Sequence, residues 1–445
     1  MNIVNQTTKK LSYIALSLLL PLTCSNISFA NNISLEQMTA DVSYLASDDL
    51  KGRGNFTTEI DQAGDYISNR FKEIGLTPLS GFSSFKQTFN VMNIKPLAIN
   101  IELNGKTINS ENTAMVSTIS NINWQSTKDF TTHTVAADGN FRKTVSEINQ
   151  QGGKHLVLLN NAHSKIFSGY KGYFSRGINK LSIDHQGAII IVLTDETQID
   201  NINISAKTNI TKQTLTNIVG VLKGHEKSGE NVLFSGHYDH LGSKDGEGDT
   251  IYNGADDDAS GTTAVINLAQ HYANQGNNSR SLIFAAFTAE EIGGFGSRYF
   301  SEHINPDSIT AMINIEMIGK PSKFGAGQVW MTGMERSSLG DILNNYLKNK
   351  QGKIYKDPYP EQKLFYRSDN ATLARLGVPA HSFSSTQLDK DKFYHQVSDD
   401  IDSLDLNSMH QVIENLAIAT QGLADGTITP SRIDKNTVKS RGKIY

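Results

Sequence analysis

Cysteine is nearly absent from this sequence, which contains a single one, Cys24, among 445 residues. It falls within the first thirty residues, which have the pattern of a removable signal. A mature chain without cysteine forms no disulfide and has no cysteine nucleophile. Disulfide-stabilised folds and cysteine-dependent catalysis are therefore excluded.

Long apolar runs are absent as well. The apolar run at residues 11–22 follows two lysines and is about twelve residues long, whereas a membrane-spanning helix needs roughly 18 to 20. Ser28 and Ala30 have the spacing that signal peptidase prefers. We predict a signal peptide over 1–30, cleaved after Ala30, a secreted or periplasmic location, and no stable membrane insertion after signal removal. Lipid attachment at Cys24 is less favoured, because "PLT" before it lacks the small residues of a lipobox.

Neither sign of charge dominates the composition. Lys and Arg number 41 and Asp and Glu 45, which gives a formal net charge of −4. The sequence has no basic half, no aromatic residues interleaved with basic ones, and no glycine-rich phosphate loop of the Walker type. Nucleic acid is therefore not an expected partner.

The chain is long enough for two domains, or for one large α/β domain with an insertion. Residues 61–79 place apolar side chains at helical spacing before Gly75, which predicts an amphipathic helix. From about 92 to 214, short alternating apolar runs are separated by Asn, Ser, Gly and Thr clusters, and no helical pattern of comparable strength occurs. We predict an inserted β-rich module there.

From residue 215 onward, apolar runs of strand length alternate with helical patterns, the last at 406–424. Near-continuous apolar strands between helices are typical of an α/β sheet covered on both faces. We predict an α/β fold with a mixed, mostly parallel central sheet flanked by helices. The expected parts are one α/β domain from 31–91 and 215–425, the inserted β-rich module at 92–214 and a loose C-terminal tail at 426–445.

Acids and histidines gather where these strands are expected to end, which is where α/β sheets place their sites. Crowded carboxylates raise each other's pKa unless a cation compensates. Histidine and carboxylate without cysteine suit Zn²⁺ or a similar ion, and two-metal hydrolases use one carboxylate as a bridge. The residues concerned are His237, Asp239, His240, Asp256, Asp257, Asp258, Glu290, Glu291, Glu316, His395, Asp399 and Asp400.

In combination, the motifs that carry these residues resemble the M28 peptidases, zinc-dependent aminopeptidases with co-catalytic metals. The resemblance extends from "YLASDDLKGRG" at 44–54 to the last helix and is strongest between Asn217 and Asp400. It implies the M28 zinc-peptidase fold. The motifs are H-x-D at 237–239, G-A-D-D-x-A-S-G at 254–261, A-E-E-x-G-x-x-G-S at 289–297, N-x-E-M-I-G at 314–319 and Y-H-x-x-S-D at 394–399.

The resemblance implies two zinc ions per chain. Asp257 matches the bridging ligand, and the Asp257–Asp258 peptide matches a bond that is cis in relatives. Asp239 matches the carboxylate that orients the imidazole of a ligand histidine. Glu316 stands where many relatives have Asp. The implied zinc ligands are His237 and Glu316 for the first ion, Glu291 and His395 for the second, and Asp257 for both.

The resemblance also implies the catalytic groups. Glu290 matches the general base that acts on a zinc-bridging water, and Tyr394 is placed to donate a hydrogen bond to the tetrahedral oxyanion. Arg367 and Asp369 match a segment that lines the substrate pocket. The implied activity is the removal of N-terminal residues from peptides with a free N-terminus.

Several alternatives stay open. An Asp triplet is more often a solvated loop or helix cap than a metal site, and Asp256 keeps that interpretation, as a polar neighbour. His240 is interpreted as structural or as a neighbour of the ligands. The module at 92–214 occupies the place of a protease-associated domain in many relatives but matches it weakly. The alternative functions are an M28-fold carboxypeptidase or dipeptidase, a single-zinc glutaminyl cyclase, and a non-catalytic peptide-binding relative.

Overall fold

The computed structural model describes Met1 and residues 33–348, 350, 352–439 and 442–445. Apart from Met1, the predicted signal peptide with Cys24 and its cleavage point lies outside the described residues. The chain divides into two units, Met1–Asn31 and Asn32–Tyr445, and the second contains all the described helices and strands. None of these helices combines the length and apolar character needed to cross a membrane.

A sheet of twelve described strands runs through the second unit, with four parallel neighbours at its centre. In order these are β14 (Arg280–Phe287), β11 (Lys227–His237), β15 (Ile309–Ile315) and β18 (Ala380–Ser384). Strand β10 (Ile202–Leu222) pairs antiparallel with β14, so the sheet is mixed, as predicted. Its other strands are β1 (Thr77–Pro78), β2 (Lys86–Leu103), β3 (Lys106–Thr107), β5 (Asn121–Trp124), β8 (Ile178–Lys180), β16 (Val329–Met331) and β17 (Ile354–Lys356).

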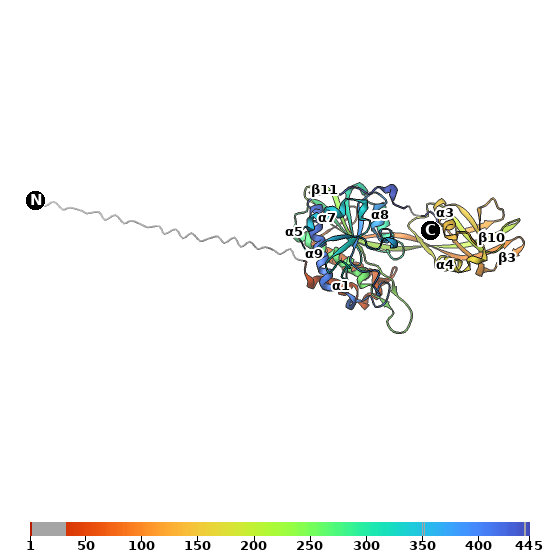
Figure 1. Cartoon of the computed structure of the whole chain (residues 1–445), viewed down its shortest axis with the longest axis horizontal. Coiled ribbons are helices and arrows are strands. Elements are labelled where there is room, and N and C mark those ends of the chain that lie inside the picture. The colour runs from red at the N-terminus through yellow and green to blue at the C-terminus, as the bar shows by residue number, and fades with distance from the viewer. Residues whose placement is uncertain (2–32, 349, 351, 440–441) are drawn as a thin grey trace. The chain divides into compact units, whose positions relative to one another are not determined.

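Helices cover both faces of the central strands (Figure 1). Every residue of β14 is buried, because alternate side chains enter two different cores. Leu282 and Phe284 belong to the larger core, and Ile283 and Ala285 to the core on the opposite face. The larger core takes side chains from α1 (Leu35–Leu45), α2 (Thr58–Ile74), α5 (Gly261–Gln275), α7 (Leu339–Leu347) and α9 (Leu406–Ala424), and the other from α6 (Phe295–Glu302) and α8 (Asn370–Ala374).

The two strongest helical patterns of the sequence form helices with ordinary end signals. The hydroxyl of Thr57 accepts a hydrogen bond from the backbone N–H of Ile60 at the start of α2, and Gly75 ends it in the left-handed region, with φ 89°. Helix α9 covers the predicted residues, and Asp405 caps its first turn through the N–H of Ser408.

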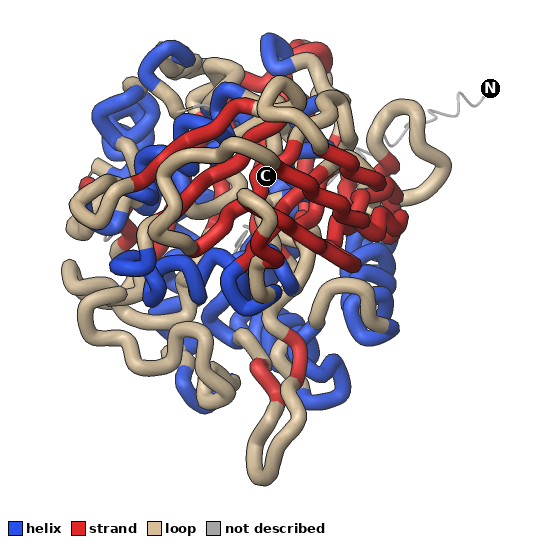
Figure 2. Tube along the Cα trace, turned by 90° about the vertical axis from the view of Figure 1, so that its right-hand side faces the viewer, coloured by secondary structure: helices blue, strands red, loops and turns tan. Residues whose placement is uncertain are grey.

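The inserted residues form a second, four-stranded sheet and two helices. The sheet order is β4 (Thr113–Ser117), β9 (Ala188–Leu193), β7 (Lys154–Leu159), β6 (Thr131–Val135). Figure 2 views the molecule from the side of these residues. The expectation that no strong helix occurs here is wrong, because α3 (Phe141–Gln151) and α4 (Ser164–Ser175) are regular helices. Two glycines in α4 and the short apolar stripe of α3 weaken their sequence signals.

The expected domain boundaries at about 92 and 214 fall inside long strands. Strand β2 runs through residue 92 and β10 through residue 214, and the two pair along most of their length. The division into a domain and an inserted module therefore remains a prediction. A separate two-stranded ribbon, β12 (Gly242–Ser243) with β13 (Ile251–Tyr252), comes after β11.

The C-terminal segment is not loose where it is described. Ile433 and Ile444 are buried, and Ile444 lies in the core between the inserted sheet and its helices. The Asn149 side-chain oxygen accepts the backbone N–H groups of Ile444 and Tyr445, both at 2.9 Å. Two separate apolar residues form no periodic pattern that a sequence could reveal. The packing of the C-terminal segment was therefore not predicted.

Candidate metal centre

The candidate ligands lie at one edge of the central sheet. Strand β11 ends at His237, and Glu316 directly follows β15. Glu290 and Glu291 follow β14 by three and four residues. Because β14, β11 and β15 are parallel neighbours, their carboxyl ends meet at the same edge, as expected for an α/β sheet.

Asp257 lies between the two histidines. Its Oδ1 is 3.2 Å from His237 Nε2, and its Oδ2 is 3.2 Å from His395 Nε2. His237 Nε2 is also 3.4 Å from Glu316 Oε1, and His395 Nε2 is 3.3 Å from Glu291 Oε2. The structure thus brings all five predicted ligands together, with one oxygen of Asp257 facing each half of the cluster.

The buried carboxylates of this cluster are stabilised by nearby positive charge. Burial would raise the pKa of Asp257, but hydrogen bonds with His237 and His395 outweigh burial and hold it below its usual range. Burial opposes a charged His395, yet Asp257 and Glu291 raise its pKa to about 10. Burial likewise opposes a charged His237, and Glu316 and Asp257 raise its pKa well above the usual value. Protons on the imidazoles thus fill the role that a cation takes in a metal site.

The donor set fits divalent ions of the zinc type. Imidazole nitrogen and carboxylate oxygen are the ligands that zinc accepts when cysteine is missing. Two compact groups of such atoms occur among the described residues: His237 with Asp258 and Glu316, and His240 with Asp257 and Glu291.

Asp258 and His240 belong to these groups although neither is a predicted ligand. The Asp258 carboxylate accepts the backbone N–H groups of His237, Gly261 and Met317, at 3.0 to 3.1 Å. The peptide between Asp257 and Asp258 is cis, as the resemblance predicted. His240 Nδ1 is 2.7 Å from Glu291 Oε1, so His240 contacts one predicted ligand directly.

Asp239 acts differently from the prediction. His237 Nδ1 is 3.0 Å from the backbone oxygen of Asp239, whereas the Asp239 carboxylate is 3.7 Å away. That carboxylate instead accepts the backbone N–H groups of Glu290 and Glu291 and the amide of Asn55. With these donors satisfied, Asp239 positions the turn that carries the two glutamates rather than the imidazole.

The predicted catalytic groups border the cluster. Glu290 is partly buried, and burial together with Glu316 and Asp369 raises its pKa well above the usual value. The Tyr394 ring stacks on His395 with centroids 3.9 Å apart, and its hydroxyl accepts a hydrogen bond from Arg367 Nη2 at 3.2 Å.

Arg367, one of the two residues predicted to line the substrate pocket, lies beside the cluster in a position that fits this prediction. Arg367 borders cavities that also include Glu316 and Tyr394 on one side and Glu290 and Glu291 on the other. Asp369 lines neither of these two cavities and is 1% exposed, so its role beside the cluster stays a prediction. Burial raises its pKa to about 7.

Comparison with known families identifies the part of the chain that holds this cluster. Residues 217–420 match the sequence profile of peptidase family M28. This segment belongs to peptidase family M28. The match contains every predicted ligand and both predicted catalytic residues.

The curated relatives share only part of their length with this chain. A vacuolar membrane protease of Schizosaccharomyces pombe is 25% identical over 270 residues, which is 59% of this chain and 29% of the relative. A probable zinc metalloprotease of Pyrenophora tritici-repentis is 38% identical over 109 residues, 24% of each chain. The chain thus spans about a quarter of the length of the curated relatives it matches.

Solved structures share the fold of the M28 segment and of most of the remaining chain. An aminopeptidase from Aneurinibacillus sp. strain AM-1 is similar with a TM-score of 0.53 and 16% identity, covering 92% of this chain and 97% of that one. A zinc aminopeptidase from Bacillus subtilis has a TM-score of 0.54 and 14% identity, covering 92% and 99%. At this identity the likeness concerns the fold.

The M28 site depends on residues that were not predicted. The buried guanidinium of Arg53 donates to the backbone oxygens of Leu45, Tyr238, Asn253 and Gly254. It thereby ties the segments before Asp239 and Asp257 together, and burial lowers its pKa to about 10. Two further side chains hold residues of the site in place. The Asn55 amide donates a hydrogen bond to the Asp239 carboxylate, and the Ser368 hydroxyl donates to Glu316 Oε2 at 2.5 Å. A buried arginine has no local sequence signal, although its "KGRG" segment belongs to the stretch where the resemblance begins.

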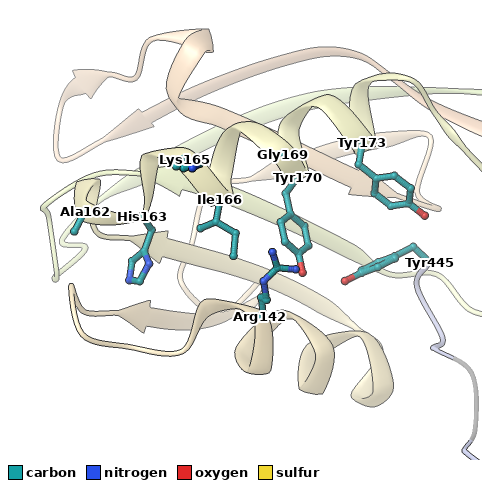
Figure 3. A pocket seen from close by; sticks show the side chains of 9 residues that line it. All are labelled: Arg142, Ala162, His163, Lys165, Ile166, Gly169, Tyr170, Tyr173 and Tyr445. Atoms are coloured by element: carbon teal, nitrogen blue, oxygen red, sulfur yellow. The ribbon is translucent and has the colours of Figure 1, made fainter. Parts of the chain in front are cut away.

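Another cavity, of about 750 Å³, lies between inserted residues and the C-terminal Tyr445, outside the M28 segment. In Figure 3, Arg142 points toward Tyr170, and Tyr445 lies beside Tyr173. None of the predicted ligands lines it, and His163 is its one histidine.

Proposed function

We propose that this protein is an aminopeptidase that removes N-terminal residues from peptides and holds two zinc ions. The observation that carries the proposal is the placement of Asp257, with one carboxylate oxygen toward His237 and Glu316 and the other toward His395 and Glu291. The M28 segment and the zinc enzymes among its relatives and structural neighbours support it.

The residues then have separate tasks. His237 and Glu316 would hold one ion, Glu291 and His395 the other, and Asp257 would bridge them. Zinc, when bound, supplies a Lewis acid that polarises a carbonyl and lowers the pKa of water. Glu290 accepts the proton of the attacking water and delivers it to the leaving amine. Tyr394 donates a hydrogen bond to the oxygen that becomes negative in the tetrahedral intermediate.

Replacing the general base tests this assignment. In Glu290→Gln, kcat on aminoacyl-nitroanilides should fall about 10²- to 10⁴-fold while zinc content stays near that of the wild type. Exposed Glu302→Gln on α6 is the matched control and should keep its activity. Near-full activity of Glu290→Gln, or purified protein without zinc, would contradict the proposal.

Blocked substrates test whether hydrolysis requires a free N-terminus, and cleavage of the free aminoacyl-nitroanilide itself argues against a carboxypeptidase, because this substrate has no C-terminal carboxylate. N-acetylated nitroanilides should not be cleaved, since the proposal requires a free N-terminus. Equal cleavage of blocked and free substrates would exclude the aminopeptidase and leave a zinc hydrolase.

We also propose export through a signal peptide over 1–30. The supporting features are its two lysines, its short apolar run and the Ser28 and Ala30 spacing. Mass spectrometry of the protein recovered outside the cytoplasm should show Asn31 as the first residue. Recovery of an uncleaved chain from the cytoplasm would contradict export.

A further inference from the structure

A cavity of about 300 Å³ opens beside the metal centre, between Glu316 and Tyr394. Its wall includes the apolar side chains of Leu364 and Leu388 and the indole of Trp330. Because it adjoins a predicted zinc ligand and the predicted oxyanion donor, it is the place for the side chain of the substrate's first residue. This step rests on the proposed function.

Two cations line this cavity without neutralising partners. Arg367 donates to Tyr394 Oη at 3.2 Å and to Gln362 Oε1 at 3.5 Å, and both acceptors are uncharged. Lys392 is exposed and, like Arg367, forms no salt bridge with a described residue.

The acids of the same cavity are engaged. Asp391 Oδ1 is 3.1 Å from Lys320 Nζ, and its Oδ2 accepts the backbone N–H of Tyr394 at 2.9 Å. Glu316 contacts His237 and accepts the Ser368 hydroxyl. The free charge that faces an incoming side chain is therefore positive.

We infer that this cavity selects substrates whose N-terminal residue is Glu or Asp. Arg367 is the specificity-determining residue, because a guanidinium matches a carboxylate with two parallel N–H donors. Lys392 adds a second positive charge at the same cavity.

The decisive comparison is between Glu and Gln substrates, which have nearly the same shape. The kcat/KM of the zinc-loaded enzyme for Glu-nitroanilide should exceed that for Gln-nitroanilide about ten- to a hundred-fold, as expected for a hydrogen bond to a charged group. Arg367→Gln should reduce the Glu to Gln ratio to the few-fold preference that Lys392 alone supports, and Arg367→Lys should keep a larger part of the preference. The Glu to Gln ratio is the readout because Arg367 also contacts Tyr394. Losing that contact would change the rates on the Glu and Gln substrates by the same factor and would leave their ratio unchanged.

Lys392→Gln and Lys390→Gln form a matched pair. Both lysines are exposed, two residues apart, but only Lys392 lines the cavity. Lys392→Gln should lower the Glu to Gln ratio several-fold, and Lys390→Gln should leave it unchanged. If both variants lowered the ratio equally, the preference would come from the overall positive charge of this surface and not from Lys392 in the cavity. That result would overturn the role assigned to Lys392.

The failure of this inference differs from the failure of the proposed function. Cleavage of Leu- and Ala-nitroanilides with no preference for Glu or Asp overturns the inference and leaves the aminopeptidase intact. A preference only for peptides with a free C-terminal carboxylate also overturns it, since Arg367 would then bind the peptide end. Calorimetric titration of the zinc-loaded protein with L-glutamate and L-glutamine tests the inference without turnover, and equal affinity overturns it.

Discussion

At the scale of single residues, three adjacent aspartates have three different tasks. Asp257 faces both histidines, and Asp258 accepts backbone N–H groups. Asp256 is buried between the Thr386 hydroxyl and the Gly319 N–H, with Lys320 3.4 Å away. Its pKa is raised to about 6 by burial, against the attraction of Lys320. Adjacent positions in a kinked segment point in different directions, which explains the division.

Substituting asparagine at two of these positions tests that division. Asp257→Asn should lose most of its bound zinc and at least about 100-fold of its activity, because even residues behind the ligands cost 10- to 100-fold when changed. Asp256→Asn should keep its zinc, since Asp256 contacts none of the five predicted ligands through its side chain. Inductively coupled plasma mass spectrometry measures the zinc, and equal losses in both variants would contradict the division.

At the scale of elements, Arg53 connects the segment before α2 with the end of β11 and with the turn before Asp257. Arg53→Met should lower the free energy of unfolding by about 3 kcal/mol, because several buried carbonyls lose their donor at once. Lys51→Met is the control from the same segment. The Lys51 pair with Glu59 lies at the surface, where solvent screens it, and should contribute little to the free energy of unfolding. Chemical denaturation measures the free energy of unfolding of both variants. A decrease in Arg53→Met as small as that in Lys51→Met would show that Arg53 does not stabilise the fold.

Strand β18 contains a histidine that makes stability depend on pH. His381 is fully buried between the Thr332 carbonyl and the Ser337 hydroxyl, and burial lowers its pKa to about 4. The unfolded chain binds a proton there between about pH 6.5 and 4 and the folded chain does not, so stability falls as pH falls through this range. The loss should be on the order of 3 kcal/mol.

The slope of unfolding free energy against pH, compared between wild type and His381→Gln, measures this contribution. The variant should have a shallower slope between pH 4 and 6.5. Exposed His303→Gln should keep the slope of the wild type. A variant slope equal to that of the wild type would show that other groups cause the acid sensitivity.

At the scale of the whole molecule, residue patterns that repeat along the sequence could be predicted. Contacts between residues far apart in the sequence could not. The apolar runs of β14 and β15 and the helical repeat of α9 indicated the fold, and ordered motifs indicated the cluster around Asp257. The helices α3 and α4 were missed because their apolar repeats are short. The roles of Arg53 and the Asp239 carboxylate depend on backbone groups brought close only by folding, and no residue pattern encodes these partners.

Metal removal should affect the stability of the whole molecule, because the cluster draws carboxylates from several elements into one buried place. Under the proposed function, removing the ions leaves Asp257, Glu291 and Glu316 to repel each other, with the imidazole protons and the Arg53 guanidinium as partial compensation. Ions that bind only the folded chain stabilise it by mass action. Chelation should therefore lower the melting temperature of the wild type, and two equivalents of zinc should restore it. Asp257→Asn should respond to neither treatment. A melting temperature that chelation leaves unchanged, in protein shown to have held zinc, would mean that the acids are compensated within the fold and that the cluster does not need the metal to be stable.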